Sequence, residues 1–239
     1  MEQNNWIHQL KIRNLRHSDY EDVAKMMEIS YTSMGGPWEQ HEFDTLLKLF
    51  PEGQICIEDQ GTVVAVALTL KIDYSNLEKD HSYEDIVSDG KFESHDKKGD
   101  YLYGIDVVVH RDYQGMRLGR RLYDARKELC ENLNLKGIIV GGRIPGYARY
   151  HKEMNPSEYI RKVRDREIVD KVLTFQLAND FHPKRVIRNY NPEDKASRSH
   201  AVFLVWDNIF YQRSEKRIWG RKSNVRMGIA QWQMRQFQS

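Results

Sequence analysis

The sequence is poor in cysteine and has no long apolar run. Its two cysteines are Cys56 and Cys130, and their spacing fits neither a zinc site nor an obvious disulfide. We therefore expect both to be reduced thiols in the core of a cytoplasmic protein. The start (MEQNNWIHQL) also lacks a charged segment ahead of an apolar one. We accordingly expect neither a transmembrane helix nor a signal peptide.

An excess of charge of one sign is also lacking. The 37 basic residues nearly balance the 35 acidic residues, which gives a formal net charge of +2. This balance gives no reason to expect a nucleic-acid or membrane partner. The chain of 239 residues is 40% hydrophobic and 30% charged, which is typical of a soluble globular protein with one domain or slightly more.

The most informative stretch covers residues 101–133. Residues 101–109 (YLYGIDVVV) are rich in aromatic and β-branched side chains, which predicts a strand covered on both faces. A short polar turn follows at residues 110–113. Apolar residues then recur at helical spacing, which predicts a long helix: Leu118, Leu122, Ala125, Leu129 and Leu133.

Residues 114–119 (QGMRLG) connect this strand to this helix. The first turn of a helix has N–H groups without intrahelical partners, together with the positive end of the helix dipole, so it can cradle a phosphate. Gly115 and Gly119 would allow close approach, and the positive charge would come from Arg117, Arg120 and Arg121. Such glycines and arginines also occur without any ligand, so spacing alone leaves both interpretations open.

Val109 and the QGMRLG segment resemble motif A of the GNAT superfamily of acyl-CoA-dependent N-acyltransferases. In that motif Gln or Arg is followed by two residues, Gly, one residue, and Gly or Ala. One position departs, because Arg117 stands where the family has its middle glycine. The predicted strand at residues 137–142 (GIIVGG) and a closing strand pair (KRVIRNY and AVFLVWD) come in the family's order. The resemblance covers most of residues 10–212.

The resemblance implies an α/β (α+β) fold with a mixed, mostly antiparallel twisted sheet, a central splayed strand pair and helices on both faces. It also implies an N-acetyltransferase that uses acetyl-CoA and acts on a small-molecule or peptide amine, without a metal. The implied cofactor-binding residues are Val107, Val109, Gln114, Gly115, Met116, Arg117, Leu118, Gly119 and Arg120. Backbone N–H groups near Val107 and Val109 are the implied oxyanion donors. Arg117 either changes the loop or supplies a guanidinium to the pyrophosphate.

Two residues are candidates for catalysis. Asp106 lies within an apolar strand, where burial would raise the pKa of a carboxyl group and favour a base acting directly or through water. Its alternative role is a structural partner for an arginine or a backbone N–H. Tyr147 follows the second strand of the splayed pair, so it is expected near the chemistry together with Arg143 and Tyr150. The alternative is that both tyrosines pack as half-buried aromatic residues.

The closing helix predicted at residues 171–179 departs from the family pattern. The tyrosine that often acts as general acid on this helix is absent, and Phe175 and Gln176 stand in its neighbourhood. An acid, if one is used, must therefore come from elsewhere in the chain.

Residues 73–99 are polar and show no clear period. Loops of this length are usually functional covers or mobile segments, and we expect a surface excursion over the acceptor site. A metal site using His81 and His95 is the alternative, although the two histidines lack ligand spacing.

The tail predicts a second unit. Residues 213–224 form a basic linker, and residues 225–239 begin an alternating strand that resembles the opening of a nitrilase-like carbon-nitrogen hydrolase. The whole chain resembles the N-terminal portion of bacterial proteins that join a GNAT domain, here residues 1–212, to such a hydrolase. The chain itself is expected to have no hydrolase activity. Two alternatives to an enzyme stay open: an acyl-CoA-sensing domain and an interaction module for the hydrolase. A homodimer is also left open.

Overall fold

The computed structural model describes residues 8–30, 36–77 and 80–213. Its centre is a seven-stranded sheet in the order β1-β2-β3-β4-β5-β7-β6, in which only β4 and β5 run parallel. The strands are β1 (Leu10–Asn14), β2 (Ile55–Asp59), β3 (Thr62–Ile72), β4 (Tyr101–Val109), β5 (Gly137–Arg143), β6 (His182–Ile187) and β7 (Ala201–Asp207). The predicted fold class is confirmed.

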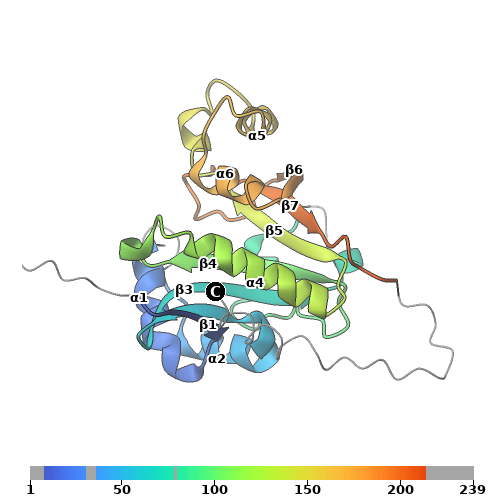
Figure 1. Cartoon of the computed structure of the whole chain (residues 1–239). Helices are drawn as coiled ribbons and strands as arrows, with labels where there is room; N and C mark the ends of the chain where they lie inside the picture. Colours follow the sequence, from blue (N-terminus) through green and yellow to red (C-terminus); the bar gives the residue numbers. More distant parts are fainter. Residues whose placement is uncertain (1–7, 31–35, 78–79, 214–239) are drawn as a thin grey trace, which may run out of the picture.

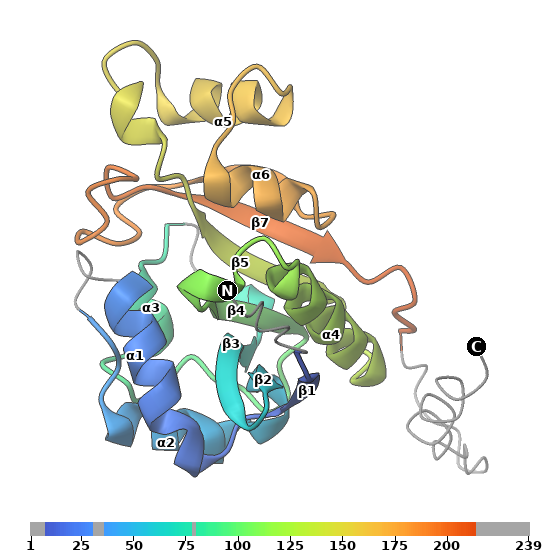
Figure 2. The same ribbon diagram turned by 60° about the vertical axis from the view of Figure 1, so that its left-hand side comes forward.

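Helices cover both faces of this sheet (Figures 1 and 2). They are α1 (Tyr20–Ser30), α2 (Gln40–Leu49), α3 (Tyr83–Val87), α4 (Leu118–Asn132), α5 (Pro156–Arg164) and α6 (Lys171–Leu177). One core contains buried side chains of α1, α2 and α3, and a second contains those of α4, α5 and α6. Within the described residues no helix is long and apolar enough to cross a membrane.

The strand at the centre of the sheet is bulged. Leu68 of β3 lies opposite Asp106 of β4, whereas Thr69 lies opposite Gly104, so Ile105 is an extra residue in β4. β4 pairs with β5 only from Tyr101 to Gly104, and beyond that point the two strands are no longer paired. The bulge and the separation of the parallel pair therefore begin at the same place.

A buried arginine occupies this place. Arg126 of α4 is 1% exposed. Its Nε donates to the Thr69 hydroxyl at 2.9 Å, and its Nη2 donates to the carbonyl oxygens of Leu68 at 3.2 Å and Asp106 at 3.0 Å. The guanidinium thus bridges the two strands where the bulge interrupts their ladder.

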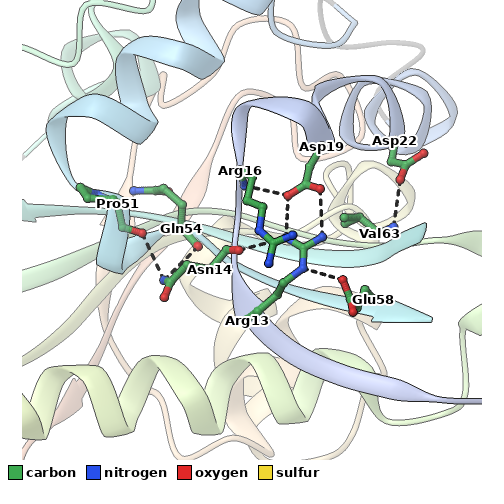
Figure 3. A network of polar contacts seen from close by, with 9 residues as sticks. All are labelled: Arg13, Asn14, Arg16, Asp19, Asp22, Pro51, Gln54, Glu58 and Val63. Carbon is green, nitrogen blue, oxygen red and sulfur yellow. Dashed lines mark hydrogen bonds and ion pairs between the residues drawn. The ribbon is translucent and has the colours of Figure 1, made fainter. Parts of the chain in front are cut away.

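A second polar network fastens the edge strand β1 (Figure 3). Arg13 of β1 binds both carboxylate oxygens of Asp19, at 2.7 and 2.9 Å, and also binds Glu58 of β2. The Asp19 carboxylate accepts the Arg16 N–H at 2.7 Å as well. Burial alone would raise the pKa of Asp19, but the bonds from Arg13 and Arg16 hold it below its ordinary value. These bonds join β1, β2 and the entry to α1.

Residues 73–99, expected to be a surface excursion over the acceptor site, combine exposed and buried side chains in their described part. This segment contains α3, and it inserts Ile86 and Phe92 into the core at 0% and 1% exposure. Its apolar residues are too few to show a period, yet Ser82 caps α3 and places them inward. Residues 78–79 lie outside the described part. So do residues 31–35 and, beyond Arg213, the predicted linker and tail strand.

Both cysteines lie in the core. Cys56 and Cys130 are buried free thiols, and burial raises the pKa of each to about 12. A thiol with so high a pKa stays protonated near neutral pH and is a poor nucleophile.

The bonds of Arg126 give a stability prediction. Arg126→Met removes the guanidinium and leaves three buried acceptors without their donor, so the free energy of unfolding should fall by about 3 kcal/mol or more. Arg121→Met is the matched control, because Arg121 is an exposed arginine of the same helix. Its effect should stay within about 0.5 kcal/mol. Urea unfolding followed by circular dichroism measures both, and equal midpoints would contradict the bridging role.

Candidate active site

A cleft opens where β4 and β5 separate. It encloses about 840 Å³. Residues of β4 from Gly104 onward form one wall, and Val140 and Gly141 of β5 form the other. The start of α4 and one face of α6 complete it. Because β4 has no β5 partner beyond Gly104, backbone groups on this strand edge are available to a bound molecule.

The loop before α4 has a glycine-like backbone conformation at Arg117, where the family motif has a glycine. Arg117 caps the helix with φ +60°, in the left-handed region. Such a conformation costs a non-glycine residue about 1–2 kcal/mol. Gly115 is also left-handed, with φ +89° and open space around it. The departure from the family motif therefore leaves the loop conformation compatible with an anion at the helix N-terminus.

Unpaired positive charge surrounds this helix start. Arg117 and Arg120 are exposed and line the cleft, and neither forms a salt bridge with any residue that the structure describes. Lys171 of α6 lines the cleft from the other side. Arg121 is exposed but does not line it. The cleft thus presents free cations beside the N–H groups of the first turn.

The structure brings nearly all of the predicted cofactor residues together. Those lining the cleft are Val107, Val109, Gln114, Gly115, Arg117, Leu118, Gly119 and Arg120. Met116 does not line it and packs instead against the small apolar cluster formed by β2, β3 and α4. Gly119 has a packing role as well, since a Cβ there would lie 3.0 Å from the Phe175 ring. Their individual roles toward a cofactor remain predictions.

A second, smaller cavity meets the cleft through the sheet. It encloses about 260 Å³ on the side of α2 and α3. The residues shared by the two cavities are Ile105, Asp106, Gly141 and Arg143. A molecule in the cleft and a molecule in this second cavity would therefore meet at the strand separation.

Asp106 lies at this meeting point. It is half-buried, and its carboxylate accepts a hydrogen bond from the Tyr83 hydroxyl at 3.3 Å. Its backbone carbonyl accepts from Arg126. The position suits a base, and the Arg126 bond also supports the structural alternative. Both interpretations made from the sequence therefore stay open.

Arg143 reaches the same point but has a structural partner. Its Nε and Nη2 bind the Asp194 carboxylate at 2.6 and 2.8 Å. Burial would raise the pKa of Asp194, but the Arg143 bond and the bonds from Ser197 hold it below its ordinary value. The Ser197 hydroxyl also accepts the Ile144 N–H at 3.0 Å. This pair fixes the end of β5 at the edge of the cleft.

Tyr147 is not placed at the cleft. It is 5% exposed, and its hydroxyl donates to the Met154 carbonyl at 3.2 Å. Its ring packs beside that of Tyr159 at 5.4 Å, as does the ring of Tyr150 at 5.6 Å. This geometry matches the aromatic-packing alternative, so the catalytic role of Tyr147 stays a prediction without support from its position.

Tyr123 of α4 is a cleft residue that the sequence analysis missed. It is 3% exposed, and its ring meets that of Phe175 edge-on at 5.2 Å. Burial raises the pKa of Tyr123, opposed by the charge of Arg126 and a hydrogen bond with Gln176. The available signal was its spacing, because Tyr123 lies four residues after Gly119 on the same helix face.

Gln176 of α6 also lines the cleft and was noted only as a neighbour of the missing tyrosine. Its Oε1 is buried and has no hydrogen-bond partner among the described residues. A buried acceptor without a partner is costly unless a ligand or water supplies a donor. The amide groups of a cofactor chain would supply one.

Comparison with known proteins identifies the family. Residues 23–145 match the acetyltransferase (GNAT) family. The chain belongs to this family. It is 38% identical over 95% of its length to the probable hydrolase YhcX of Bacillus subtilis, but it spans only 44% of that protein.

Two further matches extend over almost the whole length of the protein that is matched. The uncharacterized N-acetyltransferase YkwB of Bacillus subtilis is 29% identical over 86% of this chain and 92% of its own. The GNAT-like decarboxylase GphF, solved in complex with isobutyryl-CoA, has a TM-score of 0.70 with 18% identity. The match covers 82% of this GNAT chain and 98% of GphF, and at that identity it supports the fold alone.

The conformation of Arg117 yields a paired prediction. Arg117→Ala and Arg117→Gly should both weaken binding of CoA by about 5- to 30-fold, equivalent to about 1–2 kcal/mol for a charge-assisted bond to phosphate. Only Arg117→Gly relieves the left-handed strain, so it should be more stable to unfolding than Arg117→Ala, by up to about 1 kcal/mol.

Calorimetry with CoA and dephospho-CoA measures the binding of both variants, and urea unfolding measures their stability. Arg121→Ala is the control, because this exposed arginine does not line the cleft. Unchanged CoA affinity in both Arg117 variants would remove the guanidinium from the phosphate site.

Proposed function

We propose that this GNAT domain is an N-acetyltransferase that transfers the acetyl group of acetyl-CoA to an amine. The observation that carries the proposal is the cleft at the separation of β4 from β5, with the α4 N-terminus and two free arginines along it and Asp106 at its junction with the second cavity. The family match and the printed name of YkwB support it.

The residues present fit the cofactor. Acetyl-CoA supplies a thioester, whose carbonyl carbon an amine can attack. The loop of residues 114–117 and the first turn of α4 would hold the pyrophosphate, with Arg117 and Arg120 neutralising its charge. The unpaired edge of β4 near Val107 and Val109 would face the cofactor arm and supply N–H donors to the oxyanion.

The second cavity is the proposed acceptor site. Aromatic side chains line it, including Trp38 and Tyr83. Five carboxylates line it as well, those of Glu42, Glu84, Asp89, Asp106 and Asp194. The one cation among the described residues of this lining, Arg143, is paired with Asp194. This lining favours positively charged amines over neutral or acidic acceptors. Polyamines, amino sugars with several amines and basic peptides are therefore the first acceptors to test.

Two side chains and the positioning of the substrates have proposed roles in the transfer. Asp106 takes the proton that the amine nitrogen loses during attack, directly or through water. Tyr123 donates a proton to the departing sulfur, since its raised pKa keeps it protonated. Close positioning of amine and thioester at the strand separation supplies much of the remaining rate.

A non-catalytic role is the competing proposal. The domain would then bind acyl-CoA without turnover, or serve as an interaction module for a nitrilase-like hydrolase in a longer protein. The name of YhcX and its greater length support a fused hydrolase. On this view residues 1–212 form the GNAT domain, residues 213–224 a linker and residues 225–239 the start of the hydrolase.

The deciding experiment combines calorimetry with a thiol-release assay. The chain is titrated with acetyl-CoA and CoA, then assayed with acetyl-CoA and a panel of polyamines, amino sugars, basic peptides and neutral amines. Acetyl-CoA binding with amine-dependent release of CoA supports the enzyme. Binding without release from any amine supports the sensing role. No binding by folded protein would overturn the cofactor site.

Asp106→Asn tests the proposed base. The amide keeps the size of the side chain but cannot accept the proton, so turnover should fall about 100-fold or more. The dissociation constant for CoA should change less than twofold. Steady-state kinetics and calorimetry measure these quantities. Wild-type turnover, or a chain that no longer folds, would favour the structural role.

Tyr123→Phe tests the proposed acid. The ring and its contact with Phe175 are kept, whereas the hydroxyl is lost. We expect turnover to fall about 10-fold or more with an ordinary thioester. The loss should shrink with an acyl donor whose thiol has a lower pKa, because such a leaving group needs less protonation. An equal loss with both donors would argue against proton donation.

A further inference from the structure

Three buried side chains form a hydrogen-bonded line behind the strand separation. His81 Nε2 lies 2.9 Å from the Tyr103 hydroxyl, which lies 3.0 Å from the Tyr190 hydroxyl. The three residues are 2%, 0% and 5% exposed. They come from distant parts of the chain: the segment before α3, strand β4 and the segment after β6. Nothing in the proposed transfer so far uses them.

One end of this line reaches the meeting point of the two cavities. Tyr190 lines the acceptor cavity, and a Cβ on Gly141 would lie 2.5 Å from its hydroxyl. Gly141 lines both cavities. The charge of Asp106 also contributes to the raised pKa of Tyr190, after the larger effect of burial. The Tyr190 hydroxyl is therefore beside the place where the acceptor nitrogen would react.

The other end reaches a different cavity. His81 lines a space of about 730 Å³ that shares only Glu84 with the acceptor cavity and no residue with the cleft. This space is bordered by carboxylates, including those of Asp73, Asp85 and Asp96. The line thus runs between two cavities whose linings share only Glu84.

The three side chains of the line differ in the protonation states that they can adopt. Burial raises the pKa of both Tyr103 and Tyr190, so both hydroxyls stay neutral, and a neutral hydroxyl can donate one proton while accepting another. His81 is the member of the line that can hold a positive charge near neutral pH. Hydrogen bonds with Ser82 lower the pKa of the neighbouring Asp85, and the charge of His81 adds a smaller contribution.

The groups that face His81 come from every element around it. They are Tyr103 of β4, Tyr190 after β6, the aromatic ring of Phe203 of β7, and the carboxylate of Asp85 of α3. The charged group among these described residues is the Asp85 carboxylate.

We propose that His81, Tyr103 and Tyr190 form a proton exit for the acceptor amine, a role that rests on the proposed N-acetyltransferase function. An acceptor that arrives as an ammonium ion must lose one proton before its nitrogen can attack. Tyr190 accepts that proton as its own moves to Tyr103, and the Tyr103 proton moves to Nε2 of His81 in the tautomer with hydrogen on Nδ1. The imidazolium then releases its Nδ1 proton to the solvent of its cavity. Rotation of the two hydroxyls and a flip of the imidazole ring restore the starting arrangement.

This step completes the proton balance of the reaction. An ammonium acceptor and acetyl-CoA give an amide, free CoA thiol and one released proton. The second proton of the nitrogen passes to Asp106 during attack, and the sulfur receives one from Tyr123. Return of the Asp106 proton to Tyr123, directly or through water, restores both groups. The exit accounts for the released proton. Asp106 and His81 therefore act on different protons, and their variants should differ in pH dependence.

His81→Gln is the main test. The glutamine amide can still accept a hydrogen bond from Tyr103 but cannot take its proton. With the best amine of the panel, kcat/KM should fall about 10-fold or more at pH 7. The deficit should disappear above the pKa of the amine, where the acceptor is already neutral. The dissociation constant for CoA should not change.

His95→Gln is the matched control. His95 lines the same cavity as His81, and its Nδ1 accepts the Lys71 N–H at 3.3 Å, outside the hydrogen-bonded line. Its pH profile should overlay that of the wild type. Tyr103→Phe is the second test variant, in case His81→Gln does not fold, and it should reproduce the deficit at pH 7. Thermal unfolding is measured for every variant.

Each outcome decides the proposal. A deficit confined to pH values below the amine pKa supports the exit. A wild-type profile in His81→Gln and Tyr103→Phe overturns it while leaving the acetyltransferase function intact. An equal loss at every pH, accompanied by weaker CoA binding or lower stability, assigns these residues a structural role and also overturns it. A folded wild-type chain that binds acetyl-CoA but acetylates no amine overturns the exit and the proposed function together.

Discussion

The arrangement of this GNAT domain depends on the guanidinium of Arg126 in the bulge of β4. The side chain is fully buried and has no ion pair among the described residues, although Asp106 and Tyr123 lie close enough to oppose the lowering of its pKa by burial. A cation in that position is destabilising unless its donors are satisfied. Here Nε and Nη2 meet the Thr69 hydroxyl and the carbonyl oxygens of Leu68 and Asp106, at the place where the register of β3 and β4 shifts. The guanidinium supplies donors to the acceptors at the bulge, and these acceptors satisfy the donors of the buried guanidinium.

The cleft follows from this pairing. Gly104 is the last residue of β4 that pairs with β5, and a Cβ there would lie 2.6 Å from Nη1 of Arg126. The guanidinium therefore fills the space directly over Gly104, at the point where β4 turns away from β5. The separation exposes one edge of β4 to the larger cavity, and it also opens the sheet to the second cavity. A donor and an acceptor can thus approach from opposite faces without competing for space.

The local part of this structure was predictable from the sequence. The strand, loop and helix of residues 101–133 carry strong periodic patterns, and β4 and α4 match them closely. The cofactor residues followed from a contiguous motif, and nearly all of them line one cleft. The left-handed conformation of Arg117 was not predictable, since an arginine there gives no sign that it adopts a glycine-like backbone.

The contact among Tyr103, Tyr190 and His81 could not be predicted, for a different reason. Tyr103, Tyr190 and His81 lie far apart in the sequence and meet only because β4 lies between α3 and the segment after β6. Residues 73–99 looked like an unstructured cover because the few apolar side chains that anchor them have no period. Tyr147 was favoured for its closeness to β5 in sequence, yet its ring turns into the core with Tyr159.

The tyrosines show how the same residue type divides between packing and chemistry. Tyr147 and Tyr159 each bond a fixed protein acceptor, the Met154 carbonyl and the Asp170 carboxylate, away from the cleft lining. Tyr103 and Tyr190 bond each other, and a pair of hydroxyls can exchange donor and acceptor roles whereas a bond to a carbonyl cannot. Burial raises the pKa of all four, so acidity does not separate them. The partners and the location do: Tyr147 and Tyr159 bond acceptors away from the cleft lining, whereas Tyr103 and Tyr190 bond each other beside the strand separation.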